Sequence, residues 1–210
     1  MLTELCNSDL FDLIAERGPI LDRKLLRAMF KQICIAVDAT KQVGYAHLDI
    51  KLENILIGSD FKLRLCDFGF SRKIEIPLTG IRGSERYMAP EIIDQNTYYY
   101  DAANADIFSL GVVLFTIYFG QPPFNIACPE RDYFFKRMVQ EPHKFMRLHP
   151  STRQFYKKGL IEDEAQDLML KMMSTEKRPT IEQVLEHPYL KGEQMYTLAQ
   201  SQEALMRLVE

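Results

Sequence analysis

The feature that most constrains the fold is a polar loop that joins two segments of different periodicity. From Asp22, a residue type that caps helices, apolar side chains recur at helical spacing until Gly44. Residues 55–57 and 62–65 are short apolar runs on either side of the turn sequence GSDF, a pattern that predicts a β-hairpin. The loop between helix and hairpin has the sequence HLDIKLEN, residues 47–54.

The remainder of the chain is predicted to be mainly helical. Ser8 or Asp9 caps a short helix that ends at Gly18-Pro19. Residues 67–100 show little periodicity, and loops of this length are usually functional or disordered. Helical patterns then return at about 104–119, 130–140, 162–173, 180–186 and near 193–209. The predicted fold class is mainly α, with one hairpin and one long ordered loop near it.

Length and composition limit the classes of protein. A chain of 210 residues with 47% hydrophobic content can bury one large core or two small ones. A formal charge of −3 without any Lys/Arg block argues against nucleic acid or an anionic membrane as the main partner. The most apolar stretch, residues 107–120, is shorter than the roughly 20 residues that cross a bilayer, which predicts a buried helix.

Two further patterns bear on the cellular compartment. The amino-terminal sequence MLTELCNSDLFD carries acids where a secretory signal needs a basic start and an apolar centre. The cysteines are widely spaced, with neither C-x-x-C nor a Cys/His cluster, so neither a disulfide framework nor a zinc site is expected: they are Cys6, Cys34, Cys66 and Cys128. The expected location is the cytoplasm, with the nucleus as the alternative.

The loop and the residues after the hairpin hold the groups that phosphoryl transfer needs. Asp67, at the end of the second strand and close before a Gly that lets the backbone turn, can present a hard oxygen ligand for Mg²⁺. Asn54, at the entrance to the first strand, can supply a neutral oxygen to the same metal. Asp49 is then left to act as a base, and Lys51 as the cation that steadies the transferring group. Such catalysis is mostly positioning and charge neutralisation.

These residues lie in motifs that resemble those of the eukaryotic protein kinases. HLDIKLEN (47–54), DFG (67–69) and MAPE (88–91) resemble the catalytic loop, the metal-binding turn and the end of the activation segment, in the family's order. D-F-G alone is a weak signal, whereas the three motifs in order are specific. The resemblance runs over nearly the whole chain. It implies a kinase-like C-terminal lobe, mainly α, with a small hairpin at the active site and the N-terminal β lobe absent.

The resemblance also implies a division of the chain and a set of ligands. Residues 1–8 resemble the hinge between two lobes, residues 9–191 the C-terminal lobe with its activation segment at 67–91, and residues 192–210 would be a helical tail. ATP and Mg²⁺ are the implied cofactors, and a protein with a Ser or Thr acceptor is the implied partner. Catalytic roles fall to Asp49, Lys51 and Asn54, nucleotide contacts to Glu4, Cys6, Asp9, Leu56 and Asp67, and metal binding to Asn54 and Asp67.

Other matched residues have implied structural roles. Asp106 in ADIFSLG would hold the backbone of the catalytic loop, although Phe108 stands where the family has Trp and a simple helix cap is the alternative. Arg178 would pair with Glu91 of the A-P-E motif and pin the lower lobe. The remaining residues of this structural group are His47, Phe68 and Gly69.

Substrate preference depends on four positions. Lys51, two residues after the base, is the Ser/Thr-kinase pattern, and Ser84 in GSERYMAPE resembles the stretch that cradles the residue after the phosphoacceptor. A Ser/Thr substrate is therefore expected rather than Tyr. Glu53 is the acid that reads an upstream Arg in calmodulin-dependent and related kinases, but Thr116 stands where a second acid is expected. Glu53 either favours basic substrates or is merely solvated.

Two departures from the family pattern leave two interpretations open. The sequence starts where the upper lobe should end, so it has neither the G-x-G-x-x-G loop nor the V-A-I-K lysine. Leu48 replaces the arginine of H-R-D, which receives the phosphate of a phosphorylated activation loop. The favoured interpretation is the C-terminal lobe of a calmodulin-dependent-like Ser/Thr kinase whose upper lobe is missing from this chain. The alternative is a non-catalytic pseudokinase or scaffold module that binds proteins.

Overall fold

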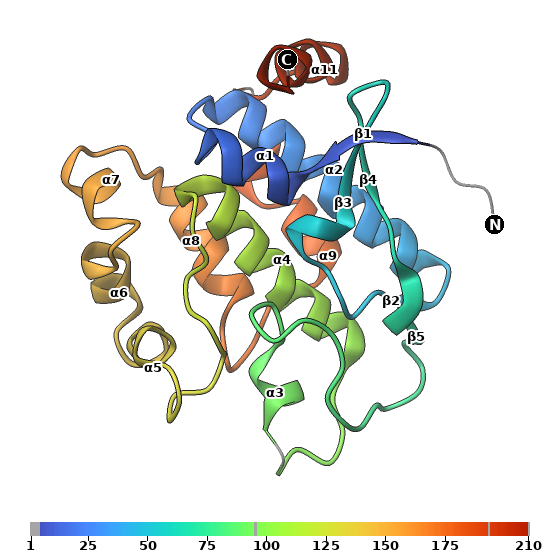
Figure 1. Cartoon of the computed structure of the whole chain (residues 1–210). Coiled ribbons are helices and arrows are strands. Elements are labelled where there is room, and N and C mark those ends of the chain that lie inside the picture. Colours follow the sequence, from blue (N-terminus) through green and yellow to red (C-terminus); the bar gives the residue numbers. More distant parts are fainter. Residues whose placement is uncertain (1–4, 95, 193, 210) are drawn as a thin grey trace.

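The computed structural model describes residues 5–94, 96–192 and 194–209, which are mainly helical, with two small sheets at one side (Figure 1). The helices are α1 (Leu10–Arg17), α2 (Arg23–Gln42), α3 (Pro90–Ile93), α4 (Ala102–Phe119), α5 (Tyr133–Gln140), α6 (Pro142–Leu148), α7 (Arg153–Lys157), α8 (Asp163–Met172), α9 (Ile181–Leu185), α10 (Pro188–Lys191) and α11 (Leu198–Val209). The strands are β1 (Cys6–Asp9), β2 (Tyr45–Ala46), β3 (Ile55–Gly58), β4 (Leu63–Leu65) and β5 (Arg72–Lys73). The predicted mainly α fold class is confirmed.

The predicted hairpin is present and forms most of the larger sheet. β3 and β4 pair antiparallel with Ile55 opposite Leu65, and β1 pairs with the other edge of β3 so that Asp9 lies opposite Leu56. Because side chains alternate along a strand, Ile55 and Ile57 are buried whereas Leu56 points to the other face and is half-buried. β2 and β5 form a separate antiparallel pair. Sequence patterns do not predict β1, because its residues CNSD are mostly polar.

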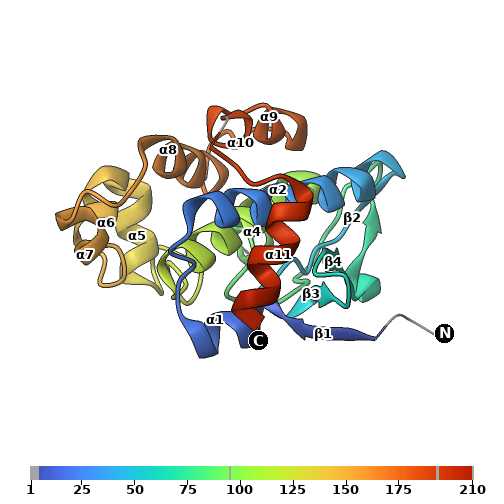
Figure 2. The ribbon, with the colours of Figure 1, turned by 90° about the horizontal axis from the view of Figure 1, so that it is seen from above.

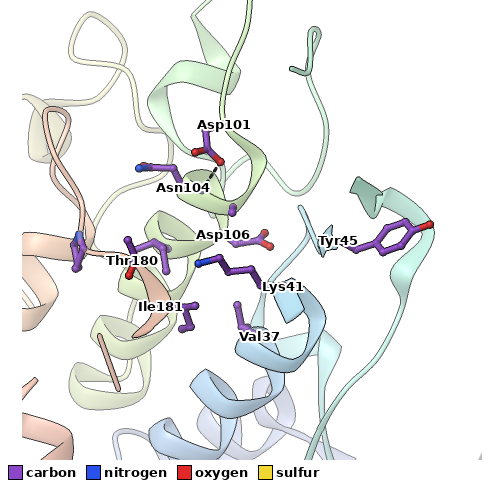
Figure 3. Close-up of a pocket in the computed structure, with 11 residues that line it drawn as sticks. Val37, Lys41, Tyr45, Asp101, Asn104, Asp106, Thr180 and Ile181 are labelled. Carbon is purple, nitrogen blue, oxygen red and sulfur yellow. Dashed lines mark hydrogen bonds between the residues drawn. The ribbon is translucent and has the colours of Figure 1, made fainter. Parts of the chain in front are cut away.

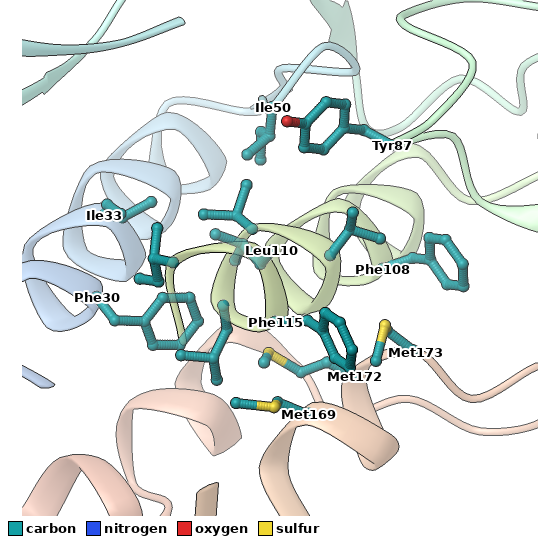
Figure 4. Close-up of a cluster of buried hydrophobic side chains, with 14 of the residues drawn as sticks. Phe30, Ile33, Ile50, Tyr87, Phe108, Leu110, Phe115, Met169, Met172 and Met173 are labelled. Carbon is teal, nitrogen blue, oxygen red and sulfur yellow. The ribbon is translucent and has the colours of Figure 1, made fainter. Parts of the chain in front are cut away.

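The hydrophobic core is built around α4, and the predicted buried helix is therefore confirmed. Figure 4 shows α4 between α2 and α8, with Phe30 of α2 on one side of Leu110 and Phe115, and Met169 and Met172 of α8 on the other. By length and composition alone α4 could cross a membrane, but 89% of it is buried inside the fold. Its uniform burial explains why it is apolar on every side.

Most predicted helices are present, with boundaries shifted by a few residues. Asp9 and Asp22 cap α1 and α2 by accepting hydrogen bonds from backbone N–H groups, as predicted. α4 begins earlier than predicted because Asp101 caps it in the same way. The helices that the sequence patterns missed, α3, α6, α7 and α10, have seven residues or fewer, which is too short for a helical period to be read.

The carboxyl-terminal helix α11 lies across α2 (Figure 2). Leu205 is fully buried, and Gln202 donates a hydrogen bond to the backbone oxygen of Asp60 in the β3–β4 turn at 2.7 Å. The Tyr196 hydroxyl donates to Asp22, the cap of α2, at 3.0 Å. The amphipathic pattern near 193–209 therefore forms a helix that is packed on the body of the protein.

One buried histidine lies among aromatic rings next to α6. His149 is 5% exposed, and its ring centroid is 4.5 Å from that of Phe134 and 5.5 Å from that of Phe115. Its Nδ1 atom is 2.9 Å from the hydroxyl oxygen of Ser151. Burial lowers the pKa of His149 to about 4, because the charged ring would lose its hydration.

We predict that His149 makes the fold less stable in mild acid. Its pKa is about 4 in the folded chain against an ordinary value of 6.5, so the unfolded state takes up the proton first as the pH falls. The loss of stability is absent above pH 6.5 and grows as the pH falls towards 4. Denaturant unfolding of the wild type and His149→Gln, each at about pH 7 and about pH 5, measures it. The wild type should lose more unfolding free energy between the two pH values than the variant, and equal losses would contradict the prediction.

Candidate active site

The loop that carries the predicted catalytic residues is held by one buried carboxylate on α4. Asp106 is 2% exposed and accepts hydrogen bonds from the backbone N–H groups of His47 at 2.6 Å and Leu48 at 2.8 Å. It is not a helix cap, since Asp101 has that role. Burial raises the pKa of Asp106 to about 7, and the two N–H groups oppose this by stabilising the ionised form. The carboxylate fixes the loop backbone to the core.

His47 joins the loop to the residues that follow the hairpin. Its ring is fully buried, with Nε2 2.9 Å from the backbone oxygen of Cys66, and Nδ1 accepts the N–H of Asp49 at 3.3 Å. These contacts place the ring proton on Nε2. Burial lowers the pKa of His47, which favours this neutral form. Phe68 packs edge-on against the ring, with 4.8 Å between centroids, so the catalytic loop and the Asp67–Gly69 turn are in contact.

The predicted catalytic side chains lie within hydrogen-bonding distance of one another. Lys51 Nζ is 3.0 Å from Asp49 Oδ2 and donates to the hydroxyl oxygen of Ser84 at 2.9 Å. Asn54 donates from Nδ2 to Asp49 Oδ2 at 3.0 Å and to the Asp49 backbone oxygen at 2.8 Å. Asp49 is 3% exposed, and its Oδ1 atom has no hydrogen-bond partner among the described residues. A buried acceptor without a donor is rare in folded proteins, which marks Asp49 as a candidate functional residue. Glu53, in the same loop, is exposed.

The two predicted metal ligands lie on either side of the hairpin. Asp67 follows β4 in the left-handed conformation, with φ of 59°, and is exposed; its Oδ1 accepts the Gly69 N–H at 3.2 Å. Asn54 uses its Nδ2 atom on Asp49, which leaves Oδ1 to act as a ligand. Within the described ranges no group of three His, Cys, Asp or Glu side chains is placed to hold a metal ion. One carboxylate and one amide oxygen suit Mg²⁺ held largely by phosphates and water.

The predicted nucleotide contacts lie on the three-stranded sheet. Leu56 points away from the core, and Asp9 lies on the same face because directly opposed residues of an antiparallel pair share a face. Cys6 lies on β1 opposite Gly58. Asp9 also caps α1 through its Oδ1 atom. Glu4, the other predicted contact, lies outside the described residues.

The end of the predicted activation segment packs directly against the catalytic loop. Gly83 has φ of 101°, and a Cβ atom there would be only 2.3 Å from the backbone oxygen of Leu48, so this position requires glycine. Ser109 of α4 donates from its hydroxyl to the backbone oxygen of Tyr87 at 2.7 Å. Leu48 itself is 4% exposed and belongs to the core. Gly83 and Ser109 were missed by sequence reasoning, because their contacts join residues far apart in the chain.

An ion pair anchors the carboxyl end of the same segment. Arg178 binds Glu91 through two contacts, Nη1 to Oε1 at 2.5 Å and Nη2 to Oε2 at 2.8 Å. Arg178 is 6% exposed and also donates to the backbone and side-chain oxygens of Asn104, at 3.1 and 2.9 Å. Its guanidinium lies 5.0 Å from the ring centroid of Phe108, the residue that stands where the family has Trp. Asn104 was not predicted, because nothing in its sequence context sets it apart.

A pocket of about 120 Å³ lies beside Asp106, between the end of α2 and the starts of α4 and α9 (Figure 3). Val37 and Ile107 form part of its apolar wall. Two of its charged residues are already engaged, because Lys41 pairs with Glu182 at 2.6 Å and Asp106 holds the catalytic loop. Nothing in this pocket marks it as the place where the chemistry occurs.

The family assignment follows from sequence comparison as well as from this geometry. The sequence model of the protein kinase domain matches residues 1–190. The chain therefore belongs to the protein kinase family, and its mainly α fold with a small hairpin is that of a kinase C-terminal lobe.

Individual relatives are serine/threonine kinases of much greater length. The chain is 31% identical to the serine/threonine-protein kinase TIO of Arabidopsis thaliana over 92% of this chain and 14% of that protein. It is 33% identical to the SNF-related serine/threonine-protein kinase of Homo sapiens over 88% of this chain and 23% of that protein. It is also 33% identical to the serine/threonine-protein kinase GIN4 of Saccharomyces cerevisiae over 87% of this chain and 15% of that protein. The predicted membership in the Ser/Thr protein kinase family is thus confirmed, and the chain spans less than a quarter of each of these relatives.

We predict that breaking the pair between Arg178 and Glu91 is costly. Arg178→Ala leaves the Glu91 carboxylate without its partner, so the free energy of unfolding should fall by about 3 kcal/mol. Lys171→Ala is the matched control, because Lys171 is paired with Asp167 on the surface with 56% of its side chain exposed. That change should cost less than about 0.5 kcal/mol. Denaturant unfolding measures both, and similar losses in the two variants would contradict a special role for the buried pair.

Proposed function

We propose that this chain carries the phosphoryl-transfer residues of an ATP- and Mg²⁺-dependent protein serine/threonine kinase. The observation that carries the proposal is the cluster of Asp49, Lys51, Asn54 and Ser84, all within hydrogen-bonding distance of a neighbour, with an unpartnered oxygen on Asp49. A merely structural charge cluster would pair that oxygen, because a buried acceptor without a donor costs free energy. This favours a catalytic role over the alternative of a non-catalytic scaffold module.

Each side chain of the cluster has a proposed part. Asp49 accepts the proton of the substrate hydroxyl through its carboxylate, and Lys51 steadies the phosphoryl group as its charge shifts. Asn54 and Asp67 hold Mg²⁺ through their side-chain oxygens. The metal, when bound, neutralises phosphate charge. Ser84, by accepting from Lys51, connects the lysine to the segment that would contact the acceptor peptide.

The nucleotide is proposed to lie on the outer face of the sheet formed by β1, β3 and β4. Leu56 and Asp9 share that face, and Cys6 lies on the same edge strand as Asp9. Glu4 is proposed as a further contact on the basis of the sequence resemblance alone. The division into a hinge-like segment 1–8, a lobe 9–191 and a tail 192–210 is part of the same proposal.

The substrate is proposed to be a protein with a Ser or Thr acceptor. The contact between Lys51 and Ser84 and the serine/threonine names of the relatives support this class. Glu53 is exposed and is proposed to favour basic residues on the amino-terminal side of the acceptor, as in the calmodulin-dependent-like group. The cytoplasm is the proposed location, with the nucleus as the alternative; the free thiols of Cys34, Cys66 and Cys128 suit a reducing compartment.

We predict that Asp49→Asn strongly slows phosphoryl transfer without weakening nucleotide binding. In the intact protein kcat should fall by at least about 100-fold, because the acceptor of the substrate proton is gone. The apparent affinity for ATP should change little. Asp163→Asn, at an exposed aspartate on α8, is the matched control and should leave kcat unchanged. Radiolabel transfer to a pool of Ser/Thr peptides measures both, and an Asp49→Asn enzyme as fast as the control would remove Asp49 from the mechanism.

We predict that Asp67→Asn weakens metal-dependent nucleotide binding. The variant keeps the shape of the side chain but loses the charge that Mg²⁺ requires. Thermal unfolding with ATP, with and without Mg²⁺, should show a magnesium-dependent rise in the midpoint for the wild type and a smaller rise for the variant. Equal rises would place the metal elsewhere.

A further inference from the structure

The segment at residues 78–84 reaches the catalytic loop without help from a charged residue at position 48. Leu48 is buried and apolar, so it offers no cation to which a phosphorylated loop could bind. The segment is nevertheless in close contact with the loop, because Gly83 lies against the Leu48 backbone oxygen. The contacts that hold it must therefore come from residues other than Leu48.

The first such contact is a short antiparallel bridge between Leu78 and Tyr100. The backbone N–H of Leu78 donates to the backbone oxygen of Tyr100 at 3.4 Å, and the backbone N–H of Tyr100 donates to the backbone oxygen of Leu78 at 3.0 Å. Both side chains are buried, at 7% and 6% exposure. Tyr100 directly precedes Asp101, the cap of α4, so the bridge attaches the segment to the start of the core helix.

The second contact is made by the Tyr100 side chain. Its hydroxyl donates to the backbone oxygen of Gly80 at 3.1 Å. Burial raises the pKa of Tyr100, and the nearby Arg82 guanidinium only partly opposes this. The hydroxyl therefore keeps its proton at neutral pH and remains a donor. One residue thus binds the segment at two points, through its backbone and through its ring.

The bound segment leads directly into the candidate active site. Ser84 follows Gly83 and accepts from Lys51 at 2.9 Å, and Lys51 is 3.0 Å from Asp49. The space enclosed by Leu48, Asp49 and Ser84 has no room for a water molecule. Movement of residues 78–83 would therefore move Ser84 away from Lys51 and open this packing.

We propose that Tyr100 is a positioning residue that holds residues 78–84 against the catalytic loop without any phosphorylation of the segment. The ordering role stands on the contacts alone, whereas its consequence for catalysis rests on the proposed function. Nothing in the sequence singles out this residue, since it is the last of three consecutive tyrosines, 98–100.

Hydrogen exchange of the intact, unphosphorylated protein tests the ordering role. Tyr100→Phe removes only the hydroxyl, so the hydrogen-bonded amides of Leu78, Tyr87 and Met88 should exchange about fivefold faster, the factor expected for one hydrogen bond of average net strength. Tyr99→Phe is the matched control, because Tyr99 is 68% exposed, and it should leave these rates unchanged. Amides of α4 should keep their protection in both variants. Unchanged exchange in Tyr100→Phe would overturn the proposal.

Phosphatase treatment of the wild type provides a second test that does not depend on the variant. The same amides should exchange at the same rate before and after treatment. Faster exchange after treatment would show that a phosphate holds the segment and would overturn the proposal.

Steady-state kinetics test the consequence for catalysis. Tyr100→Phe should raise the KM for a Ser/Thr peptide about fivefold and leave the KM for ATP and kcat nearly unchanged, since only the peptide side of the site is loosened. A fall in kcat with both KM values unchanged would indicate loss of folded enzyme and overturn the positioning role. If the wild type transfers no phosphate, the proposed function fails, and the exchange measurements still decide the ordering role.

Discussion

The candidate site depends on a carboxylate that is buried in the core. Asp106 is on α4, the helix whose side chains are almost all buried, and its two oxygens bind the N–H groups of His47 and Leu48. A buried carboxylate without such donors would cost several kcal/mol. The fold is therefore most stable when the loop backbone lies against α4. A loop, which is ordinarily the most mobile part of a protein, in this way acquires the rigidity of the core.

The same interaction explains the backbone conformation of the loop. Leu48 has φ of 64°, a left-handed conformation that costs about 1 kcal/mol or more for a residue with a Cβ. Successive backbone N–H groups at a left-handed residue can form a concavity that binds an anion. Asp106 supplies that anion from within the protein. The next residue, Asp49, is then directed towards Lys51 and Asn54.

The sequence predicted what local patterns can predict. The caps at Asp9 and Asp22, the hairpin, the buried helix and the three motifs were read from spacing and residue type, and all of these elements are present in the structure. The contacts of Asn104, Ser109 and Tyr100 were not predicted, because each joins segments about twenty or more residues apart through a backbone oxygen, which every residue carries. The loop before α4 has no regular spacing of apolar residues, so its ordered conformation is evident only from its tertiary contacts.

Leu48 stands where the family pattern has arginine, and this changes the kind of force that can order residues 78–84. A guanidinium would attract a phosphate strongly, and the strength of that attraction would vary with phosphorylation state and salt. Leu48 instead adds apolar burial that is present in every state of the protein. The contacts between Tyr100 and residues 78–80 are likewise neutral and do not depend on an added charge. The catalytic loop and the neighbouring segment are therefore joined to the core by contacts that form on folding, through Asp106 for the loop and through Tyr100 for the segment.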